Sequence, residues 1–127
     1  MPFIAFNRAF DSAAPDDLRI NTAAVLYVEA SGMDLVGQTT IHVLGQGETV
    51  NAVMESVGLV VSEIGGLVAA TRHYLSPPPA EGPSTVYICP TNVSYFRPNL
   101  PATPDFWVVR FVDGSELRIQ APLPDGL

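Results

Sequence analysis

The side chains in this sequence best suited to binding chemistry are aromatic rings and arginines gathered in its last third. They are Tyr87, Tyr95, Phe96, Arg97, Phe106, Trp107, Arg110 and Arg118. Aromatic planes beside guanidinium groups are typical of protein–protein contacts and of sites that stack bases and hold phosphates. The candidate surface for a ligand or partner lies around the loop "RPNLPATPD" and comprises Phe96, Arg97, Asn99, Phe106 and Arg110.

A structural role for the same residues is the alternative. In that interpretation Tyr95, Trp107 and Phe111 fill the core, because the apolar face of a small sheet usually packs inward. Arg110 and Arg118 then pair with Glu116 on a solvated face.

The other reactive side chains form no catalytic or metal-binding pattern. His42, in a strand, and His73, at the end of a helical segment, lack Cys or Asp partners at metal-ligand spacing. Cys89 is the single cysteine, and we interpret it as a small buried hydrophobic residue. The segment "GQGE", residues 45–48, lacks the Lys-Ser/Thr of a phosphate loop and is interpreted as a turn. We therefore expect no enzyme, no metal and no cofactor.

The strands that position the aromatic cluster include "WVVRFVDGSELRI", residues 107–119, which is typical of a β-hairpin. A two-residue turn at Asp113-Gly114 would place charges on the aromatic face. A three-residue loop that begins at Val112, with Gly114 left-handed, leaves one face almost wholly apolar. We predict this second register, which pairs Val109 with Leu117, Trp107 with Ile119, Val108 with Arg118 and Arg110 with Glu116.

A similar pattern occurs upstream. A shift of 68 positions aligns Ile20 with Ile88, Val25 with Val93, Tyr27 with Tyr95, Val28 with Phe96, Ile41 with Val109, Val43 with Phe111 and Leu44 with Val112. His42 falls on Arg110, so the polar position between apolar ones also recurs. Chance alternation of apolar residues is the alternative, and we favour duplication because the spacing matches at so many positions.

The first copy continues into "ESVGLVVSEIGGL", where Val57, Val60, Val61 and Ile64 recur at helical spacing. Ser56 is a predicted helix cap, and the following Gly65-Gly66 a predicted helix end. The predicted fold is mainly β with one short helix (α+β), built from two pseudo-repeated three-stranded β units. Residues 1–17 are predicted to form an extended N-terminal arm. Residues 18–127 form one domain, with units at 18–67 and 85–123 joined by a Pro-rich loop at 76–84.

Two segments of the first copy, "INTAAVLYVEAS" and "TTIHVLGQGETVNAVMES", carry a family resemblance. They are similar to small β proteins of the flagellar-regulator FlbD type, widespread in phage genomes, and to the first half of LytTR-type domains. The resemblance covers residues 18–64 and, more weakly, 86–121. The LytTR resemblance implies a basic DNA-reading segment, of which this chain keeps Arg72, His73 and Tyr74 before it runs into prolines.

The charge balance argues against nucleic acid as a partner. Six arginines and no lysine stand against thirteen acidic residues, for a formal net charge of −7. Because basic contacts to phosphates supply most non-specific affinity, we expect no binding to duplex nucleic acid. Charged residues make up only 15% of the chain, so we expect apolar surface to be buried between subunits of a homo-oligomer.

The N-terminal segment "MPFIAFNRAF" is apolar without a clear period. We expect it to make oligomer contacts through Phe3, Ile4, Phe6 and Phe10. It lacks the basic region and long apolar core of a signal peptide, so we expect no export by that route. The longest apolar run, "VGLVVSEIGGLVAA", is interrupted by Glu63 and is too short to span a bilayer, so we expect no membrane partner.

From the sequence, we expect a non-enzymatic structural or assembly protein of a phage-like particle, located in the virion or host cytoplasm. Its expected partners are its own copies and other assembly proteins. The alternative is a small oligomeric protein that binds a nucleotide ligand, such as a sponge for a host-defence signal, with arginines converging on phosphates. A LytTR-like transcription regulator ranks third.

Overall fold

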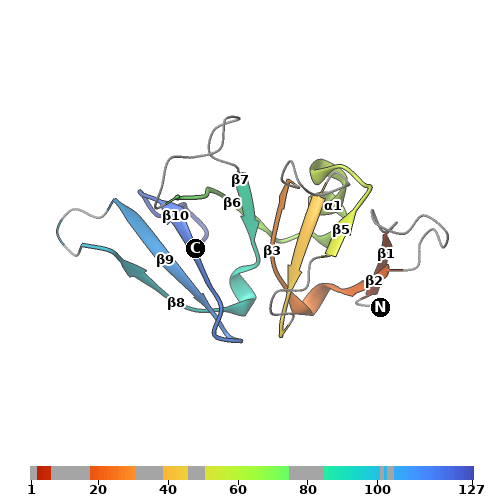
Figure 1. The fold of residues 1–127 in the computed structure, drawn as a ribbon, viewed down its shortest axis with the longest axis horizontal. Helices are drawn as coiled ribbons and strands as arrows, with labels where there is room; N and C mark the ends of the chain where they lie inside the picture. The colour runs from red at the N-terminus through yellow and green to blue at the C-terminus, as the bar shows by residue number, and fades with distance from the viewer. Residues whose placement is uncertain are drawn as a thin grey trace.

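The computed structural model describes residues 3–6, 18–30, 39–45, 51–74, 85–100, 102 and 105–127. These residues form ten strands in three antiparallel sheets, one α-helix and two short 3-10 turns, spread along one long axis (Figure 1). The chain is therefore mainly β with one short helix, which confirms the predicted fold class.

The first unit is a three-stranded antiparallel meander followed by the helix. The meander consists of β3 (Val25–Ala30), β4 (Thr39–Val43) and β5 (Asn51–Val53). A strand pair precedes it, β1 (Phe3–Phe6) with β2 (Leu18–Asn21), and the turn η1 (Thr22–Ala24) leads from β2 into β3. The core of this unit consists of Phe6, Ile20, Val25, Val28, Ile41, Val53 and Val60.

The helix α1 (Val57–Ile64) has the predicted signals at both ends. The Ser56 side chain accepts a hydrogen bond from the Leu59 backbone N at 3.3 Å, and Gly65 ends the helix with φ +75°. Gly66 also has positive φ, +71°, so the chain cannot continue as a helix. The expectation that His73 ends a helical segment is therefore wrong, because His73 follows a strand, β6 (Val68–Thr71).

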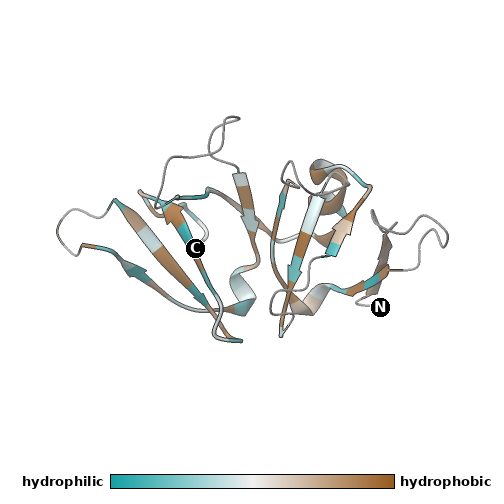
Figure 2. Cartoon of the chain, viewed as in Figure 1, coloured by the Kyte–Doolittle hydropathy of each residue, from teal (hydrophilic) through white to brown (hydrophobic). Residues whose placement is uncertain are grey.

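The second unit has the same order of elements without a helix. Its strand pair is β6 with β7 (Thr85–Ile88), followed by the turn η2 (Pro90–Asn92). Its meander consists of β8 (Val93–Pro98), β9 (Phe106–Phe111) and β10 (Glu116–Gln120), and Figure 2 shows apolar and polar residues along these strands. The core of this unit consists of Ala70, Val86, Ile88, Val109, Phe111, Leu117 and Ile119, together with Leu26 and Tyr27 from the first unit.

The β9–β10 hairpin adopts the predicted register. Phe111 N donates to Ser115 O at 2.9 Å across a three-residue loop in which Gly114 has φ +92°. Arg110 lies opposite Glu116, and Trp107 opposite Ile119. Phe111 is buried and Trp107 packs against the core, as one interpretation proposed. Tyr95 does not, because it lies on the edge strand β8 and is 47% exposed.

The two meanders share one register once residue numbers are offset by 68. The pairs Val25–Val43, Tyr27–His42 and Val28–Ile41 correspond to Val93–Phe111, Tyr95–Arg110 and Phe96–Val109. Both ladders shift register at the same place, directly before these tyrosines. The hydrogen bond from Leu44 N to Ala24 O likewise corresponds to that from Val112 N to Asn92 O. Gene duplication as the origin of this correspondence stays a prediction.

The two units share one sheet, because β7 lies between β3 and β6. The resulting five-stranded sheet has the order β5-β4-β3-β7-β6, whereas β10-β9-β8 form a separate three-stranded sheet (Figure 1). The Pro-rich loop predicted at 76–84 lies outside the described residues. Within the described part of the chain, no helix is long and apolar enough to cross a membrane.

The N-terminal segment requires a correction. Residues 3–6 of the predicted extended arm form a strand that pairs with β2. Phe6 is buried in the core of its own unit, and Ile4 packs against this core. Phe6 is therefore covered within its own chain, whereas Ile4 is only partly buried and the oligomer contact expected of it stays a prediction. Phe3 is exposed, and Phe10 lies outside the described residues.

Replacement of Gly114 by Ala tests the hairpin loop. A Cβ at this position would meet only Arg110 Nη2, at 3.8 Å, so the expected loss comes from the positive φ. We expect a loss of about 1 kcal/mol or more in unfolding free energy, measured by urea denaturation. Gly58→Ala, on the exposed side of α1 with open space around it, is the control and should cost nothing. Equal losses in both variants would contradict the loop assignment.

Candidate functional site

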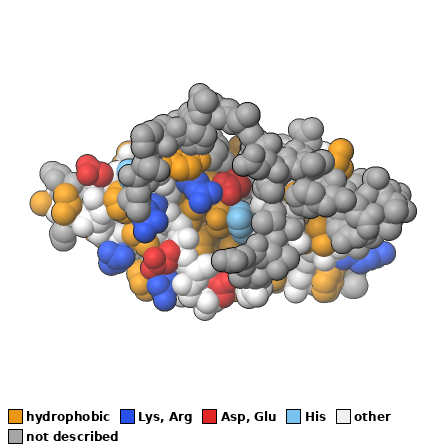
Figure 3. Space-filling view, in the orientation of Figure 1, with side chains coloured by type: hydrophobic (Ala, Val, Ile, Leu, Met, Phe, Trp, Pro, Cys, Tyr) orange, Lys and Arg blue, Asp and Glu red, His pale blue; other side chains and the backbone are white. Residues whose placement is uncertain are grey.

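A group of hydrogen bonds and ring contacts lies where the two units meet. We call this region the inter-unit joint and define it as Tyr27, Glu29, His42, Gly45, Arg72 and Asp113. Tyr27 and Glu29 lie on β3 and His42 on β4, while Arg72 directly follows β6 and Asp113 lies in the β9–β10 loop. Figure 3 shows blue, red and pale blue side chains side by side in the middle of one face, among apolar side chains.

Glu29 is the centre of the polar contacts. Arg72 Nη1 donates to both carboxylate oxygens, at 3.0 and 2.9 Å, and His42 Nε2 lies 3.0 Å from Oε1. Because an ionised carboxylate only accepts hydrogen bonds, His42 Nε2 must carry the proton in this contact. Burial acts to raise the pKa of Glu29, but the hydrogen bond from His42 and the charge of Arg72 outweigh it, so the pKa lies below its ordinary value.

Tyr27 links the two units through its ring. It stacks on His42 of its own unit, with ring centroids 4.0 Å apart, and on Phe111 of the second unit at 5.7 Å. Burial, reinforced by the negative charge of Glu29, raises the pKa of Tyr27 to about 12 despite the opposing charge of Arg72. The phenol is therefore neutral at ordinary pH, and its contribution is packing.

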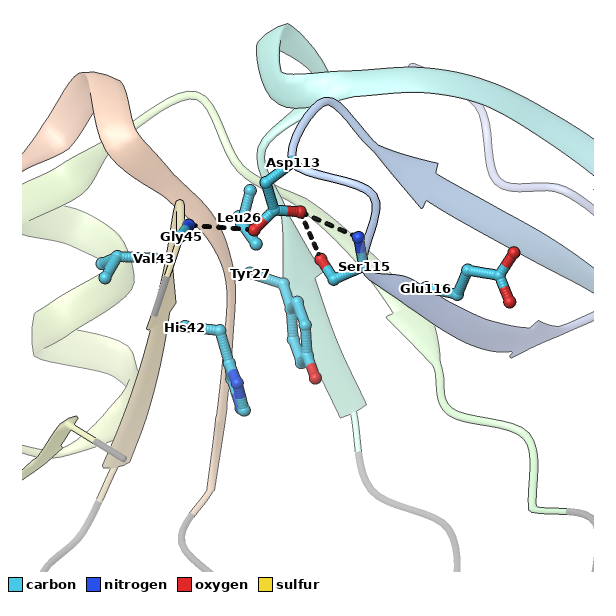
Figure 4. Close-up of a pocket in the computed structure, with 8 residues that line it drawn as sticks. All are labelled: Leu26, Tyr27, His42, Val43, Gly45, Asp113, Ser115 and Glu116. Atoms are coloured by element: carbon cyan, nitrogen blue, oxygen red, sulfur yellow. Dashed lines mark hydrogen bonds between the residues drawn. The ribbon is translucent and has the colours of Figure 1, made fainter. Parts of the chain in front are cut away.

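Backbone groups complete the inter-unit joint. Gly45 N donates to Asp113 Oδ2 at 3.0 Å, while Asp113 Oδ1 accepts from Ser115 N and Oγ, at 2.9 and 2.6 Å (Figure 4). Partial burial acts to raise the pKa of Asp113, but these hydrogen bonds outweigh it and the pKa lies below its ordinary value. The buried Asn92 amide donates to two carbonyls of the first unit, Ala23 O at 2.9 Å and Val25 O at 2.7 Å.

A hollow of about 490 Å³ opens beside these contacts. Its lining consists of Leu26, Tyr27, His42, Val43, Gly45, Asp113, Ser115 and Glu116. Figure 4 shows the Tyr27 and His42 rings side by side, with Glu116 directed away from them. The volume falls within the range of about 300 to 1,000 Å³ typical of small-molecule sites. The lining contains two carboxylates and no arginine, which disfavours a phosphate-bearing ligand.

The structure brings together only part of the predicted binding surface. The ladder between β8 and β9 places Arg97, Phe106 and Arg110 on one face of the sheet, and Phe96 lies on the other. Phe96 packs against the core of the second unit, whereas its neighbour Arg97 is exposed on the opposite side of β8. Arg110 is bound to Glu116 at 2.7 Å. The Asn99 side chain accepts from two backbone nitrogens at the start of β9, at 2.7 and 3.2 Å, and thereby closes the β8–β9 loop.

Phe106, the fifth of these residues, and two further positions, His73 and Cys89, have local structural contacts. Phe106 stacks on His73 with ring centroids 4.3 Å apart. Cys89 is partly exposed, not buried as predicted, because it lies at the start of the turn η2, where its backbone N donates to Leu26 O at 2.8 Å. Across the described ranges, no group of His, Cys, Asp and Glu is arranged to hold a metal ion.

Replacement of Glu29 by Gln tests the ion pair of the inter-unit joint. Loss of a charge partner for the half-buried Arg72 should lower the unfolding free energy by about 1 to 3 kcal/mol, a range reduced because Arg72 is 34% exposed. Since the pKa of Glu29 is lowered on folding, its contribution is complete above its ordinary pKa of 4.5 and is lost as pH falls through the lowered value.

The measurement is urea denaturation at pH 7 and at pH 3. Wild type and Glu29→Gln should differ at pH 7 and converge at the lower pH. Glu63→Gln, the same change on an exposed position of α1, is the matched control and should leave both values unchanged. A constant difference between wild type and Glu29→Gln at both pH values would show that this carboxylate does not carry the effect.

The comparisons with known proteins assign no family to this chain. No protein-family model, curated protein or solved structure matches it. The function is therefore inferred from the geometry of the inter-unit joint and from the residues that remain exposed around it.

Proposed function

We propose that this protein is a non-enzymatic structural protein that acts through contacts with its own copies and with other assembly proteins. The inter-unit joint is the observation that carries the proposal. There, one β unit binds the next by adding a strand to the edge of its sheet, with the order β4-β3-β7 across the boundary. The same kind of contact can form between molecules where an edge strand has no partner, and β8 is an edge strand of its sheet.

The polar groups of the inter-unit joint are engaged in holding the two units together. Glu29 is bound by His42 and Arg72, and Asp113 by Gly45 and Ser115. A general base or nucleophile must be able to reach a substrate proton or a reacting atom. Groups committed to contacts between two β units are better suited to rigidity than to chemistry, which supports a structural role.

Exposed apolar side chains supply surface for partners. Among the large hydrophobic residues, those about half exposed are Phe3, Met54, Leu59, Tyr95, Leu100 and Val112. Phe3 and Tyr95 lie on strands at opposite ends of the long axis (Figure 1). Exposed aromatic residues are common centres of protein–protein contacts. The setting we propose, a phage-like particle in the virion or host cytoplasm, depends on the sequence pattern shared with the small FlbD-type proteins.

Binding of a small ligand is the second candidate, because the hollow beside Tyr27 has a suitable volume. The carboxylates of Asp113 and Glu116 at its lining disfavour a nucleotide there. A LytTR-like regulator has less support. Arg72 and Arg110 are bound to carboxylates, and the net charge of −7 opposes the approach of DNA.

The solution mass of the purified protein tests the proposal. We expect light scattering over a range of concentrations to give a multiple of the 13.6 kDa chain mass. We expect no thermal shift with a panel of linear and cyclic nucleotides, since a bound ligand would stabilise the folded state. A strictly monomeric protein stabilised by a nucleotide would contradict the proposal and establish the ligand-binding alternative.

A further inference from the structure

Within the chain, the outer edge of β3 is covered by the second unit. Tyr27, Val28 and Glu29 pair with Ile88, Tyr87 and Val86 of β7. Tyr27 is only 8% exposed and lies in the core of the second unit, whereas Val28 is fully buried in the core of the first unit. Leu26 and Leu44 of the first unit pack against the same core. One edge strand and one turn of the first unit therefore supply the apolar side of this contact.

The corresponding surface of the second unit is bare in the part of the chain that the structure describes. In its sheet, order β10-β9-β8, the strand β8 is an edge and corresponds to β3 at an offset of 68 residues. Tyr95 corresponds to the buried Tyr27 and is 47% exposed, while Val112 corresponds to Leu44 and is 54% exposed. The second unit thus has the apolar residues of the contact without the strand that covers them.

The strand β2 has the features of the missing partner. Like β7, it is paired on one side with the strand before it and leads through a 3-10 turn into the first strand of a meander. Ile20 corresponds to Ile88, and both are buried in the cores of their own units. Among the described residues, the side of β2 away from β1 has no partner strand, whereas the same side of β7 is bound to β3.

We propose that copies of this chain associate head to tail, with β2 of one copy adding to the free edge of β8 of the next. This inference rests on the proposed assembly function and specifies the contact. The offset of 68 fixes its antiparallel register, which pairs Tyr95 with Ile20, Phe96 with Arg19, and Arg97 with Leu18 of the neighbouring copy. Tyr95 becomes buried, as Tyr27 is within the chain, and Val112 packs against the neighbouring copy, as Leu44 packs against the second unit.

The positions of the two edges determine the kind of assembly. β8 lies towards one end of the long axis and the β1–β2 pair at the other (Figure 1). The two surfaces differ, so the contact is heterologous, and repetition gives either a closed ring or an open filament instead of a two-fold dimer.

Substitution of Tyr95 tests the contact from one side. Position 95 is exposed in the free monomer, so Tyr95→Glu should leave the fold of the monomer intact. In the proposed assembly the same position is buried, where a charge is unfavourable. We expect the concentration for half-assembly to rise on the order of tenfold or more in light scattering. Tyr95→Phe should retain assembly. Ser62→Glu, which adds the same charge at an exposed position of α1, is the matched control and should also retain it.

A disulfide tests the register. The double variant Leu18→Cys with Arg97→Cys, in a Cys89→Ser background, joins residues that lie opposite each other only between copies. Oxidation with oxidised glutathione should give covalent multimers of three or more chains on a non-reducing gel, each single variant stopping at the dimer. The control pairs Leu18→Cys with Arg118→Cys, which lies on β10, the far strand of the same sheet, and should stop short of these multimers.

The outcomes separate the two proposals. A wild-type protein that is monomeric at every concentration would overturn both. A wild-type protein that assembles, is unaffected by Tyr95→Glu and gives no covalent multimers would overturn the β8–β2 contact and leave the assembly function standing. Loss of assembly in Tyr95→Glu alone, together with covalent multimers in the Leu18–Arg97 pair, would establish the contact.

Discussion

The backbone of β3 requires hydrogen-bond partners along both edges, and the arrangement of the two units follows from this requirement. A buried strand cannot leave its N–H and C=O groups unpaired, because water cannot reach them. β4 of the same unit pairs with one edge, and β7 of the other unit pairs with the second. The ladder between β3 and β4 is irregular at the start of β3. There the Asn92 side chain supplies the missing partner, because it donates a hydrogen bond to the Val25 carbonyl. The division into two units is therefore one of topology, because one five-stranded sheet contains strands of both units.

A buried charge with partners from both units lies at this boundary. Glu29 is only 12% exposed, and its two partners come from both units, His42 from the first and Arg72 from the second. A buried ion pair adds little net stability, because desolvation cancels most of the attraction, but a wrong alignment would leave a charge unpaired at high cost. The Glu29 carboxylate therefore favours a single register between β3 and its neighbours, while Tyr27 adds an apolar stack on Phe111 across the same boundary.

The local elements of this fold could be predicted from the sequence, and the long-range pairings could not. The β9–β10 register follows from side-chain alternation and a glycine with positive φ, and the ends of α1 follow from Ser56 and Gly65. In contrast, "VAAT" has no alternating pattern, and β6 forms because β7 offers it an edge. The Glu29–Arg72 pair joins residues 43 positions apart, and the only signal was a lone carboxylate in an apolar strand. The interpretation that places Tyr95 in the core is wrong, because periodicity identifies a strand face but cannot tell an edge strand from a central one.

The hydrogen bond between Gly45 and Asp113 has a geometric consequence. It ties the turn after β4 to the β9–β10 loop, so these two turns meet on one side of the molecule, while the far ends of the two meanders diverge (Figure 1). The relation between the units therefore includes a rotation as well as a translation. Any array that repeats this relation bends towards the side of the turns, and the angle of this wedge sets its curvature and the number of chains needed for one full revolution.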